Sequence, residues 1–513
     1  MAKLILAHDL GTTGNKASLF DEEAQLVASS FKGYGTFHPH PTWAEQNPED
    51  WWQAVILATR EIIQKAQVTG DDITAIAFSG QMMGCLPLDK TGKPLRPCII
   101  WADQRAVSQA EYLSEIIGEE HIYRITGHRI SPTYSASKML WVRENEPEIY
   151  KQVHKFVHVK DFIAYRMSGA FVTDRSDASG MNLYSLEEAT WSEEILNAIN
   201  LDPQILPEIH DSTDVVGQLT KEAAEQLGLT EGIPIVIGGG DGASATVGAG
   251  AVKEGPAYNY IGSSSWISFA SPRPIYDPRR RIFNWAHMVP HMFAPCGTMQ
   301  AAGGSYQWLR RQICGLEELE ARGIDKDVYE IMNYEAEKSV PGANGLIFLP
   351  YLQGERSPHW NPRAKGGFIG LQITHTRADM IRATLEGIAF NLRTILQSFL
   401  DSNAQINEMI LIGGGAKGRL WRQIIADIFG LPTLQPRLLE EATSLGAAVA
   451  GGVGVGLYKD FSVVNKCIEI IDRHQPNPSA QAIYERLYPV FLKSYEALVP
   501  VFDELSEARL YPD

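Results

Sequence analysis

The chain has 513 residues, too many for one compact core, so we expect two or more domains. Its net charge of −16 argues against a surface for nucleic acid or anionic membranes, although a local site can still bind an anion. Scattered cysteines without a CxxC pair, a start that turns polar too soon for a signal peptide, and no run of 18 apolar residues predict a cytoplasmic protein without disulfides or membrane spans.

Strand-like and helical runs alternate along the chain, the pattern of an α/β protein. The first pair of strands spans residues 4–20, with Asp9 ending the first strand before the turn GTTGNK. Backbone N–H groups of such a turn can bind phosphate oxygens, and Asp9 can face Mg²⁺ through water. Lys16 would add a positive charge. A tight hairpin with solvated threonines is the alternative.

Two later strands deliver polar side chains to loops. A buried strand from residue 73 ends at Gln81, and a second, from residue 98, leads to Trp101, Asp103 and Arg105. An amide, a carboxylate and a guanidinium suit the hydroxyls of a polyol, and an indole offers a flat apolar face. The alternative is that these loop residues satisfy their own backbone.

Much later in the chain than the first strand pair comes an apolar run that ends in three glycines. A second pair of strands, at residues 256–270, is also followed later by such a run. We interpret the two sets as related halves that close on one phosphorylated ligand, with domains at residues 1–252 and 253–513. After the first glycine run, Asp241 lies on a bare loop where it can accept a hydroxyl proton in phosphoryl transfer. It can also cap a helix, and both can hold.

The second glycine run, IGGGAKGR from Ile412, is close to a Walker loop but lacks its Lys and its Ser or Thr. We interpret it as a floor for adenine or ribose, with a plain strand-to-helix turn as the alternative. Two histidine pairs four residues apart lack a carboxylate or cysteine at metal-ligand spacing, so we expect no histidine metal site. The pairs are His154 with His158 and His287 with His291.

Helix starts are readable at two places. Asn47 before a proline predicts one N-terminus, and Thr376 with Asp379 forms a Thr-x-x-Asp cap ahead of a long helix with one buried stripe. The C-terminal run AIYERLYPVFLKSYEALVPVFDEL predicts one or two more helices, interrupted at Pro489 and Pro500.

Together these motifs resemble the FGGY carbohydrate kinases of the actin/Hsp70/sugar-kinase superfamily. The segment TYSASKMLWVREN, from Thr133, is close to the family's first signature, and GGFIGLQITHTRADMIRATLEG, from Gly366, matches its second at every defined position. DLGTTGNKA, SGQMMG, WADQR, GGGDGAS, the GSSS turn and LIGGGAKG follow in the family's order. The resemblance covers nearly the whole chain and implies an α/β fold of two ribonuclease-H-like, actin-like ATPase domains around a central cleft.

The resemblance also implies ATP and Mg²⁺ as cofactors and assigns roles to residues. Asp241 is similar to the catalytic base, and Asp9 and Asp241 would lie near Mg²⁺. The positions that match the family around the phosphates and the adenosine are Thr12, Thr13, Lys16, Gly262, Ser263, Ser264, Gly414, Gly415 and Ala416. Those on the sugar side are Met82, Met83, Trp101, Asp103 and Asp241.

Departures from the family pattern narrow the substrate. Glycerol kinases carry Arg-Glu at Met82-Met83, Tyr at Thr133 and Gln at Gly242, which argues against glycerol. Xylulokinases resemble this chain more closely, but typically carry His at Met83 and Asn at Gly242. A site that loses hydrogen-bonding side chains loses discrimination for the hydroxyls they bound. We predict an ATP-dependent kinase for a ketopentose such as D-xylulose, giving the 5-phosphate, with another ketose, a deoxy-sugar or a small polyol as alternatives.

A second hypothesis from another class is an actin- or Hsp70-like ATPase whose nucleotide cycle drives partner binding. The loops at 80–84 and 101–105 argue for the kinase, because a small-molecule pocket has no obvious task in a chaperone. An inactive regulatory relative is disfavoured because Asp9 and Asp241 are both present. The expected partners are a sugar and ATP, not nucleic acid or a membrane, and a homodimer is left open.

Overall fold

The computed structural model describes residues 3–437 and 441–508. The N-terminal half builds a six-stranded mixed sheet, in which β1 to β3 form an antiparallel meander and β5 and β14 run parallel to β1. β1, β5 and β14 are almost fully buried, which explains their near-continuous apolar sequences. The order across the sheet is β13 (Val215–Gln218), β14 (Pro234–Gly240), β5 (Ile73–Gly80), β1 (Leu4–Leu10), β2 (Gly14–Phe20) and β3 (Leu26–Gly33).

The C-terminal half builds a seven-stranded sheet with the same central arrangement. An antiparallel meander of β15, β16 and β18 is flanked by β21 and β22, which run parallel to β15, as β5 and β14 do to β1. The order is β17 (Phe283–Ala286), β18 (Phe293–Met299), β16 (Ser265–Phe269), β15 (Ala257–Ile261), β21 (Met409–Ile412), β22 (Thr433–Pro436) and β23 (Ile470–His474).

This duplication confirms the two related halves but corrects the pairing of their glycine runs. The first run ends β14, whereas the second follows β21, whose counterpart is β5 and not β14. Both runs nevertheless need glycine. Gly238 has φ 68° and Gly413 has φ 86°, and a Cβ there would lie 1.9 and 2.7 Å from a carbonyl oxygen of the neighbouring strand.

The predicted helix caps are confirmed. Asn47 caps α1 (Pro48–Ala66) by accepting a hydrogen bond from the backbone N–H of Glu49. Thr376 and Asp379 form the capping box of α14 (Arg377–Asp401), whose apolar stripe lies in the core of the C-terminal half.

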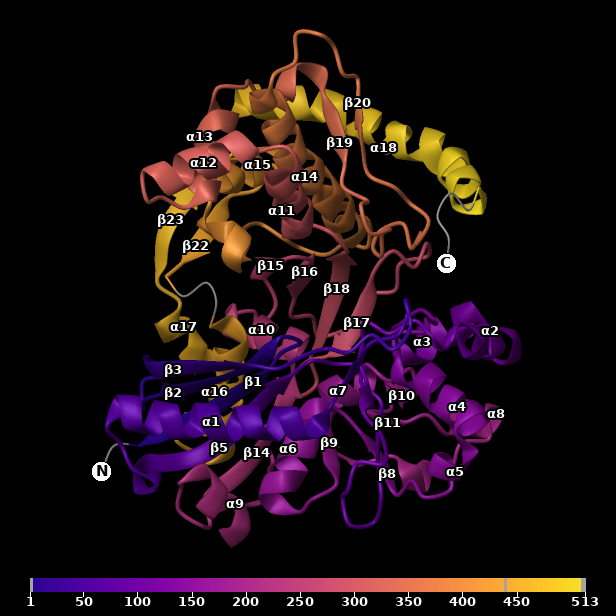
Figure 1. Ribbon diagram of the computed structural model, residues 1–513, viewed down its shortest axis with the longest axis vertical. Coiled ribbons are helices and arrows are strands. Elements are labelled where there is room, and N and C mark those ends of the chain that lie inside the picture. Colours follow the sequence, from indigo (N-terminus) through magenta and orange to yellow (C-terminus); the bar gives the residue numbers. More distant parts are fainter. Residues whose placement is uncertain (1–2, 438–440, 509–513) are drawn as a thin grey trace.

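Two helices cross the boundary between the halves. α10 (Asp241–Gly248) follows the N-terminal β14 and packs on that sheet through Ala243 and Val247, while Ala245 packs with Tyr258 and Ile410 of the C-terminal sheet. α16 (Ala442–Gly454) follows the C-terminal β22 and packs on Ile5 and Val236 of the N-terminal sheet. Figure 1 shows α16, in gold, inside the lower, N-terminal half. The boundary predicted between residues 252 and 253 therefore separates the strands of the two sheets but not their cores.

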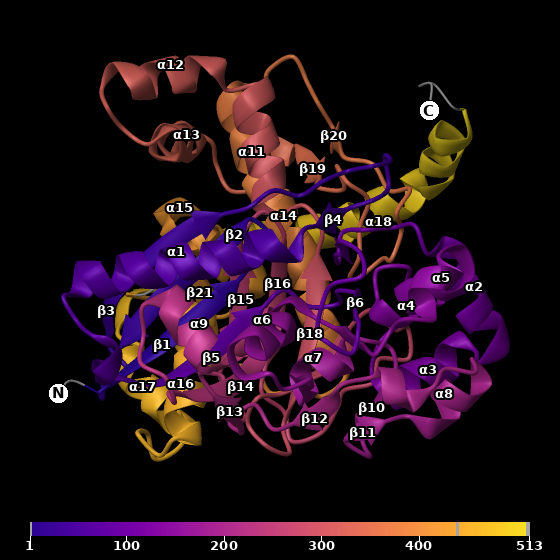
Figure 2. The same cartoon turned by 60° about the horizontal axis from the view of Figure 1, so that its bottom comes forward.

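The remaining helices cover the sheets and form a side lobe. Figures 1 and 2 show α2, α4, α5 and α8 gathered on one side of the N-terminal half with α3. These are α2 (Val107–Ile116), α3 (Glu119–Thr126), α4 (Ser135–Asn145), α5 (Pro147–Tyr150) and α8 (Glu193–Ala198). The others are α6 (Val159–Ser168), α7 (Arg175–Ser179), α9 (Lys221–Leu227), α11 (Gly303–Gln312), α12 (Gly315–Gly323), α13 (Val328–Glu337), α15 (Arg419–Phe429), α17 (Val464–Cys467) and α18 (Pro478–Glu507).

In the part of the chain that the structure describes, ten short strands pair outside the two main sheets. They tie down loops rather than extend a core, and the pairs that matter for the site are β4 with β7 and β6 with β8. The ten are β4 (Glu45–Gln46), β6 (Leu86–Leu88), β7 (Cys98–Ile99), β8 (Lys155–Val157), β9 (Val172–Asp174), β10 (Tyr184–Ser185), β11 (Thr190–Trp191), β12 (Glu208–His210), β19 (Ile347–Leu349) and β20 (Gly367–Ile369).

The predicted interruption of the C-terminal helix is wrong. α18 is one helix with Pro489 and Pro500 inside it. Tyr484, Phe491 and Phe502 bury their rings in the core of the C-terminal half, and this packing outweighs the backbone hydrogen bonds that the prolines cannot donate. Within the described residues, no helix is both long and apolar enough to cross a membrane.

Candidate functional site

Two carboxylates meet at the edge of the N-terminal sheet. Asp9 lies near the end of β1, and Asp241 is the first residue of α10, directly after β14. β1, β5 and β14 are parallel, so their carboxyl ends share this edge. Gly240, not Asp241, is the N-cap of α10, so the capping alternative for Asp241 is not what the structure has. Thr443 of α16 donates a hydrogen bond to Asp9 Oδ2 at 2.5 Å.

The electrostatics of this pair favour a cation. Burial, together with the negative charge of the nearby Asp9, raises the pKa of Asp241 to about 7. Burial also raises the pKa of Asp9, opposed by the Thr443 hydrogen bond and by the charge of Lys16 across the hairpin. Asp9 Oδ1 is buried and has no hydrogen-bonding partner within the described part of the chain. Two buried carboxylates with an unpartnered oxygen are the kind of donor set that Mg²⁺ prefers.

Each half presents a hairpin turn beside this edge. Between β1 and β2, Thr12 accepts a hydrogen bond from Trp101 Nε1 at 2.9 Å, while Thr13 is exposed. Between β15 and β16, Gly262 lies so close to α11 that a Cβ on Gly303 would be 2.4 Å from the Gly262 carbonyl oxygen. Ser263 is exposed at the tip of that second turn.

A cavity of about 680 Å³ opens beside the second turn. Its size is that of a nucleotide or drug-sized ligand site. Gly414 and Gly415 of the one-turn helix η4 (Gly414–Lys417) line this cavity, but Ala416 is buried and is not among the lining residues. The sequence did not point to Tyr306, Tyr329, Asn333 and Trp421, which also line it; aromatic residues on one face of a helix are a weak signal because core positions look the same.

A smaller cavity, of about 120 Å³, lies against Asp241. It brings together most of the predicted sugar-side residues with side chains from the other half. Of these, Ser264 of the turn was predicted on the phosphate side, whereas Trp266 and Ser268 of β16 and Cys296 and Thr298 of β18 were not predicted. These four alternate along their strands, so strand periodicity was the available signal. The lining residues are Met82, Met83, Trp101, Asp241, Gly242, Tyr258, Ser264, Trp266, Ser268, Trp285, Cys296, Thr298 and Arg356.

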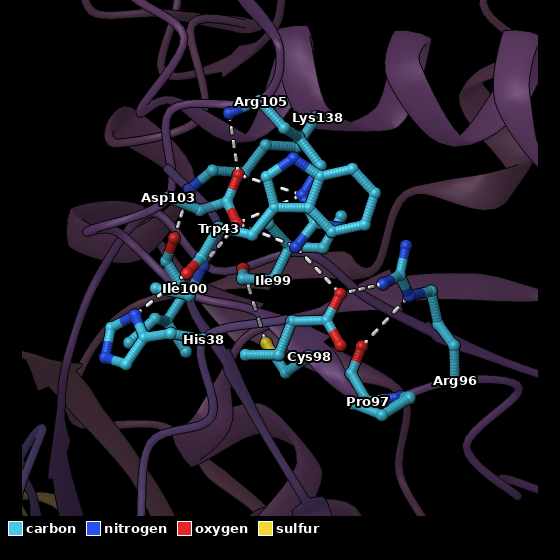
Figure 3. Close-up of polar contacts among 12 residues, drawn as sticks. His38, Trp43, Arg96, Pro97, Cys98, Ile99, Ile100, Asp103, Arg105 and Lys138 are labelled. Carbon is cyan, nitrogen blue, oxygen red and sulfur yellow. Dashed lines mark hydrogen bonds and ion pairs between the residues drawn. The ribbon is translucent and has the colours of Figure 1, made fainter. Parts of the chain in front are cut away.

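Asp103 does not line either cavity. Its carboxylate is fully buried and accepts hydrogen bonds from the Ala44 N–H at 2.6 Å and from Arg105 Nε and Nη2 at 2.9 and 2.7 Å (Figure 3). The Arg105 guanidinium in turn lies 3.7 Å over the Trp43 ring. Arg105 lies only two residues after Asp103, and its guanidinium binds the carboxylate that we predicted would bind the sugar. Gln81 is also turned inward, donating to Gln46 at 2.7 Å.

A buried charge cluster lies beneath the site. Ligand atoms of His158, Asp161 and Asp177 are close enough together to hold a metal ion. The Lys160 ammonium, however, lies 2.7 Å from Asp161, 3.0 Å from Asp174 and 3.0 Å from Asp177. This ammonium supplies the positive charge that the carboxylates need.

Comparison with known proteins places the chain among the carbohydrate kinases, enzymes of the two-domain actin-like ATPase fold. The models for the N-terminal and C-terminal domains of the FGGY family of carbohydrate kinases match residues 4–248 and 257–455. The chain therefore belongs to this family, whose members are phosphotransferases that use ATP. The Hsp70-like ATPase hypothesis is left without support.

Similar relatives carry two different substrate names. A gluconokinase of Bacillus licheniformis is 33% identical over 507 residues, covering 99% of this chain and 98% of that protein. A xylulose kinase of Staphylococcus epidermidis is 33% identical over 497 residues, covering 96% and 97%. A crystal structure of a ligand-bound xylulose kinase from Lactobacillus acidophilus has a TM-score of 0.91 at 28% identity and covers 98% of this chain and 100% of that one.

Proposed function

We propose that the small cavity binds a ketopentose such as D-xylulose, that the large cavity binds ATP, and that Asp241 is the general base that forms the sugar 5-phosphate. The observation that carries this proposal is the place of the Gly262–Ser264 turn. Gly262 and Ser263 line the large cavity, whereas Ser264 lines the small one together with Asp241. A phosphoryl group held at this turn would therefore lie between a nucleotide and an acceptor hydroxyl.

The reaction follows from this arrangement. The acceptor oxygen forms a bond to the γ-phosphorus, the bond from that phosphorus to the leaving oxygen of ADP breaks, and the hydroxyl proton passes to Asp241. Backbone N–H groups of the two turns and the Lys16 ammonium would stabilise the charge on the transferring group. Closure of the two halves would exclude water, which otherwise competes as acceptor.

Asp9 and Asp241 would hold Mg²⁺. The unpartnered, buried Asp9 Oδ1 and the raised pKa of both carboxyl groups fit a bound divalent cation. When bound, the ion would neutralise negative charge on the phosphoryl oxygens. Thr443 orients Asp9 for that role through the hydrogen bond to Oδ2.

Asp241→Asn tests the assignment of the base. General-base catalysis contributes about 100- to 10,000-fold, so sugar-dependent ADP formation should fall by that factor while ATP still binds. Turnover is followed by coupled ADP release, and ATP binding by calorimetry. Asp503→Asn, at a solvent-accessible position of α18, is the control and should leave both unchanged. Normal turnover by Asp241→Asn would refute the mechanism.

A second acceptor, an acidic sugar such as D-gluconate, is favoured by one side chain. Arg356 lines the small cavity, and its Nε has no hydrogen-bonding partner among the described residues. Burial lowers the pKa of its guanidinium, and the neighbouring Glu355 carboxyl has a pKa raised to about 8 by burial and offers little compensating charge. A substrate carboxylate would supply the missing partner in a bidentate pair.

Arg356→Gln separates the two acceptors. A charged hydrogen bond contributes about 1.5–3 kcal/mol, so the substitution should lower kcat/KM for gluconate about 10- to 100-fold if the acid is the substrate. For D-xylulose the loss should stay within about threefold. Both sugars are assayed with the wild type, with Arg356→Gln and with the exposed control Arg363→Gln. Equal losses of kcat/KM for both sugars would show that Arg356 does not bind a substrate carboxylate.

A further inference from the structure

Three backbone carbonyls converge on one buried lysine. Lys138 lies in the first turns of α4 and is fully buried. Its Nζ donates hydrogen bonds to the carbonyl oxygens of Met83 at 2.8 Å, Ile100 at 2.8 Å and Thr133 at 2.6 Å. Figure 3 shows Lys138 beside Ile100 and the Asp103–Arg105 pair.

These carbonyls belong to three separate segments that lead into the small cavity. Met83 itself lines the cavity, and Ile100 immediately precedes Trp101, which also lines it. Thr133 precedes Tyr134, whose ring packs in one cluster with Met82. A single ammonium therefore joins segments that are up to 50 residues apart in sequence, since residues 83 and 133 are both bound.

One of these segments is held in an unusual backbone conformation. Met83 has φ 61°, in the left-handed region that costs a non-glycine residue free energy unless its surroundings hold it there. The hydrogen bond from Lys138 is accepted by the carbonyl of this same residue. The contact thus helps to fix the direction in which Met83 presents its side chain.

Only an ammonium matches this arrangement. Lysine carries three N–H donors and no acceptor, and here each donor meets one carbonyl. No carboxylate lies in hydrogen-bonding contact with Lys138 in the described ranges, and Asp103 contributes at longer range. Burying such a charge costs stability, so its place in the core of the sugar-side loops calls for a reason beyond packing.

We propose that Lys138 is a positioning residue for the sugar. It holds the segments of Met83, Trp101 and Thr133 in fixed positions relative to one another, so that the acceptor pocket is formed before the sugar enters. The proposal rests on the small cavity being the sugar site. Because Lys138 touches neither cavity, its loss should weaken sugar binding without removing a group that reacts.

Lys138→Met is the main test, with Lys155→Met as the matched control. Lys155 also donates to two backbone carbonyls, of Gln204 at 2.6 Å and Leu206 at 2.8 Å, but away from both cavities. The expected result is a rise in KM for the sugar of tenfold or more in Lys138→Met, with KM for ATP changed less than about threefold. Lys155→Met should leave both constants near wild type even if its melting temperature falls. An unchanged sugar KM in Lys138→Met, or equal rises for sugar and ATP, would overturn the proposal.

Lys138→Arg keeps the test decisive if the methionine variant does not fold. Arginine retains the charge, but its planar fork cannot address three carbonyls placed around one nitrogen. We expect the same selective rise in sugar KM, and wild-type constants in this variant would contradict the proposal. The outcome is distinct from failure of the proposed function: if wild-type enzyme phosphorylates no sugar, the kinase assignment fails whatever the lysine variants do.

Discussion

At the scale of single residues, the sheet edge that carries Asp9 and Asp241 joins side chains from the two halves of the chain. Asp9 comes from the first strand, and Thr443, which binds it, comes from more than 400 residues later. This hydrogen bond is accepted by Oδ2, and among the described residues Oδ1 has no hydrogen-bonding partner. The two halves thus share control of one carboxylate.

Thr443→Val should therefore impair catalysis more than folding. The substitution keeps the shape of the side chain but removes a hydrogen bond to a charged group, worth about 1.5–3 kcal/mol, which predicts a fall in kcat of about 10- to 100-fold. Thr443→Ser retains the hydroxyl and should recover most of the activity. Steady-state kinetics at saturating Mg²⁺ measure both. If the serine variant is as poor as the valine variant, the methyl group rather than the hydroxyl is what matters.

The sequence predicted where strands deliver polar side chains better than it predicted which groups those side chains bind. Asp9 and Asp241 were predicted because each lies at the end of an apolar strand, and a strand end fixes where a side chain emerges. Asp103 follows the same rule, yet Arg105 and the Ala44 N–H capture its carboxylate, and nothing in the sequence reveals that competition. Arg356 was missed because it lies in a loop after β19 with no periodic pattern around it.

At the scale of elements, the site depends on the contact between α10 and α16. The two helices cross through glycines: a Cβ on Gly248 would lie 1.9 Å from the Ala442 carbonyl oxygen, and one on Gly446 would lie 2.0 Å from that of Ser244. α10 begins with Asp241 and α16 begins beside Thr443. The duplicated strands were predictable from their repeated patterns, whereas this crossing depends on two backbones far apart in sequence.

Gly446→Ala should force the two helices apart. A methyl group 2.0 Å from a backbone oxygen cannot be relieved by a side-chain rotation, and overpacking of this kind costs about 1–3 kcal/mol. We expect a lower melting temperature together with a lower kcat, since Asp241 and Thr443 move with their helices. Gly323→Ala, in α12 with open space around the new Cβ, is the control and should not be destabilised. Equal melting temperatures for both variants would contradict the tight crossing.

At the scale of the whole molecule, the two cavities differ in which half of the chain lines them. The lining of the large cavity comes entirely from residues 261 onward, in the C-terminal half. The small cavity is lined from both sides, by Met82 and Trp101 of one half and by Trp266 and Arg356 of the other. Ligands in the two cavities should therefore affect the separation of the halves differently, because a ligand shifts only those conformations that it binds with different affinity.

Small-angle scattering can test this division. In the proposed mechanism a non-hydrolysable ATP analogue occupies the large cavity of the C-terminal half, and the N-terminal turn meets its phosphates only on closure, so the analogue alone should change the radius of gyration little. The accepted sugar contacts both halves and should shift the population toward the closed form, with the smallest radius when both ligands are present. Trp266→Ala, which removes a large part of the C-terminal wall of the small cavity, should abolish the sugar effect and spare analogue binding. Full closure by the analogue alone would mean that the nucleotide reaches the N-terminal half, and that the halves are drawn together through the phosphate turns rather than through the sugar.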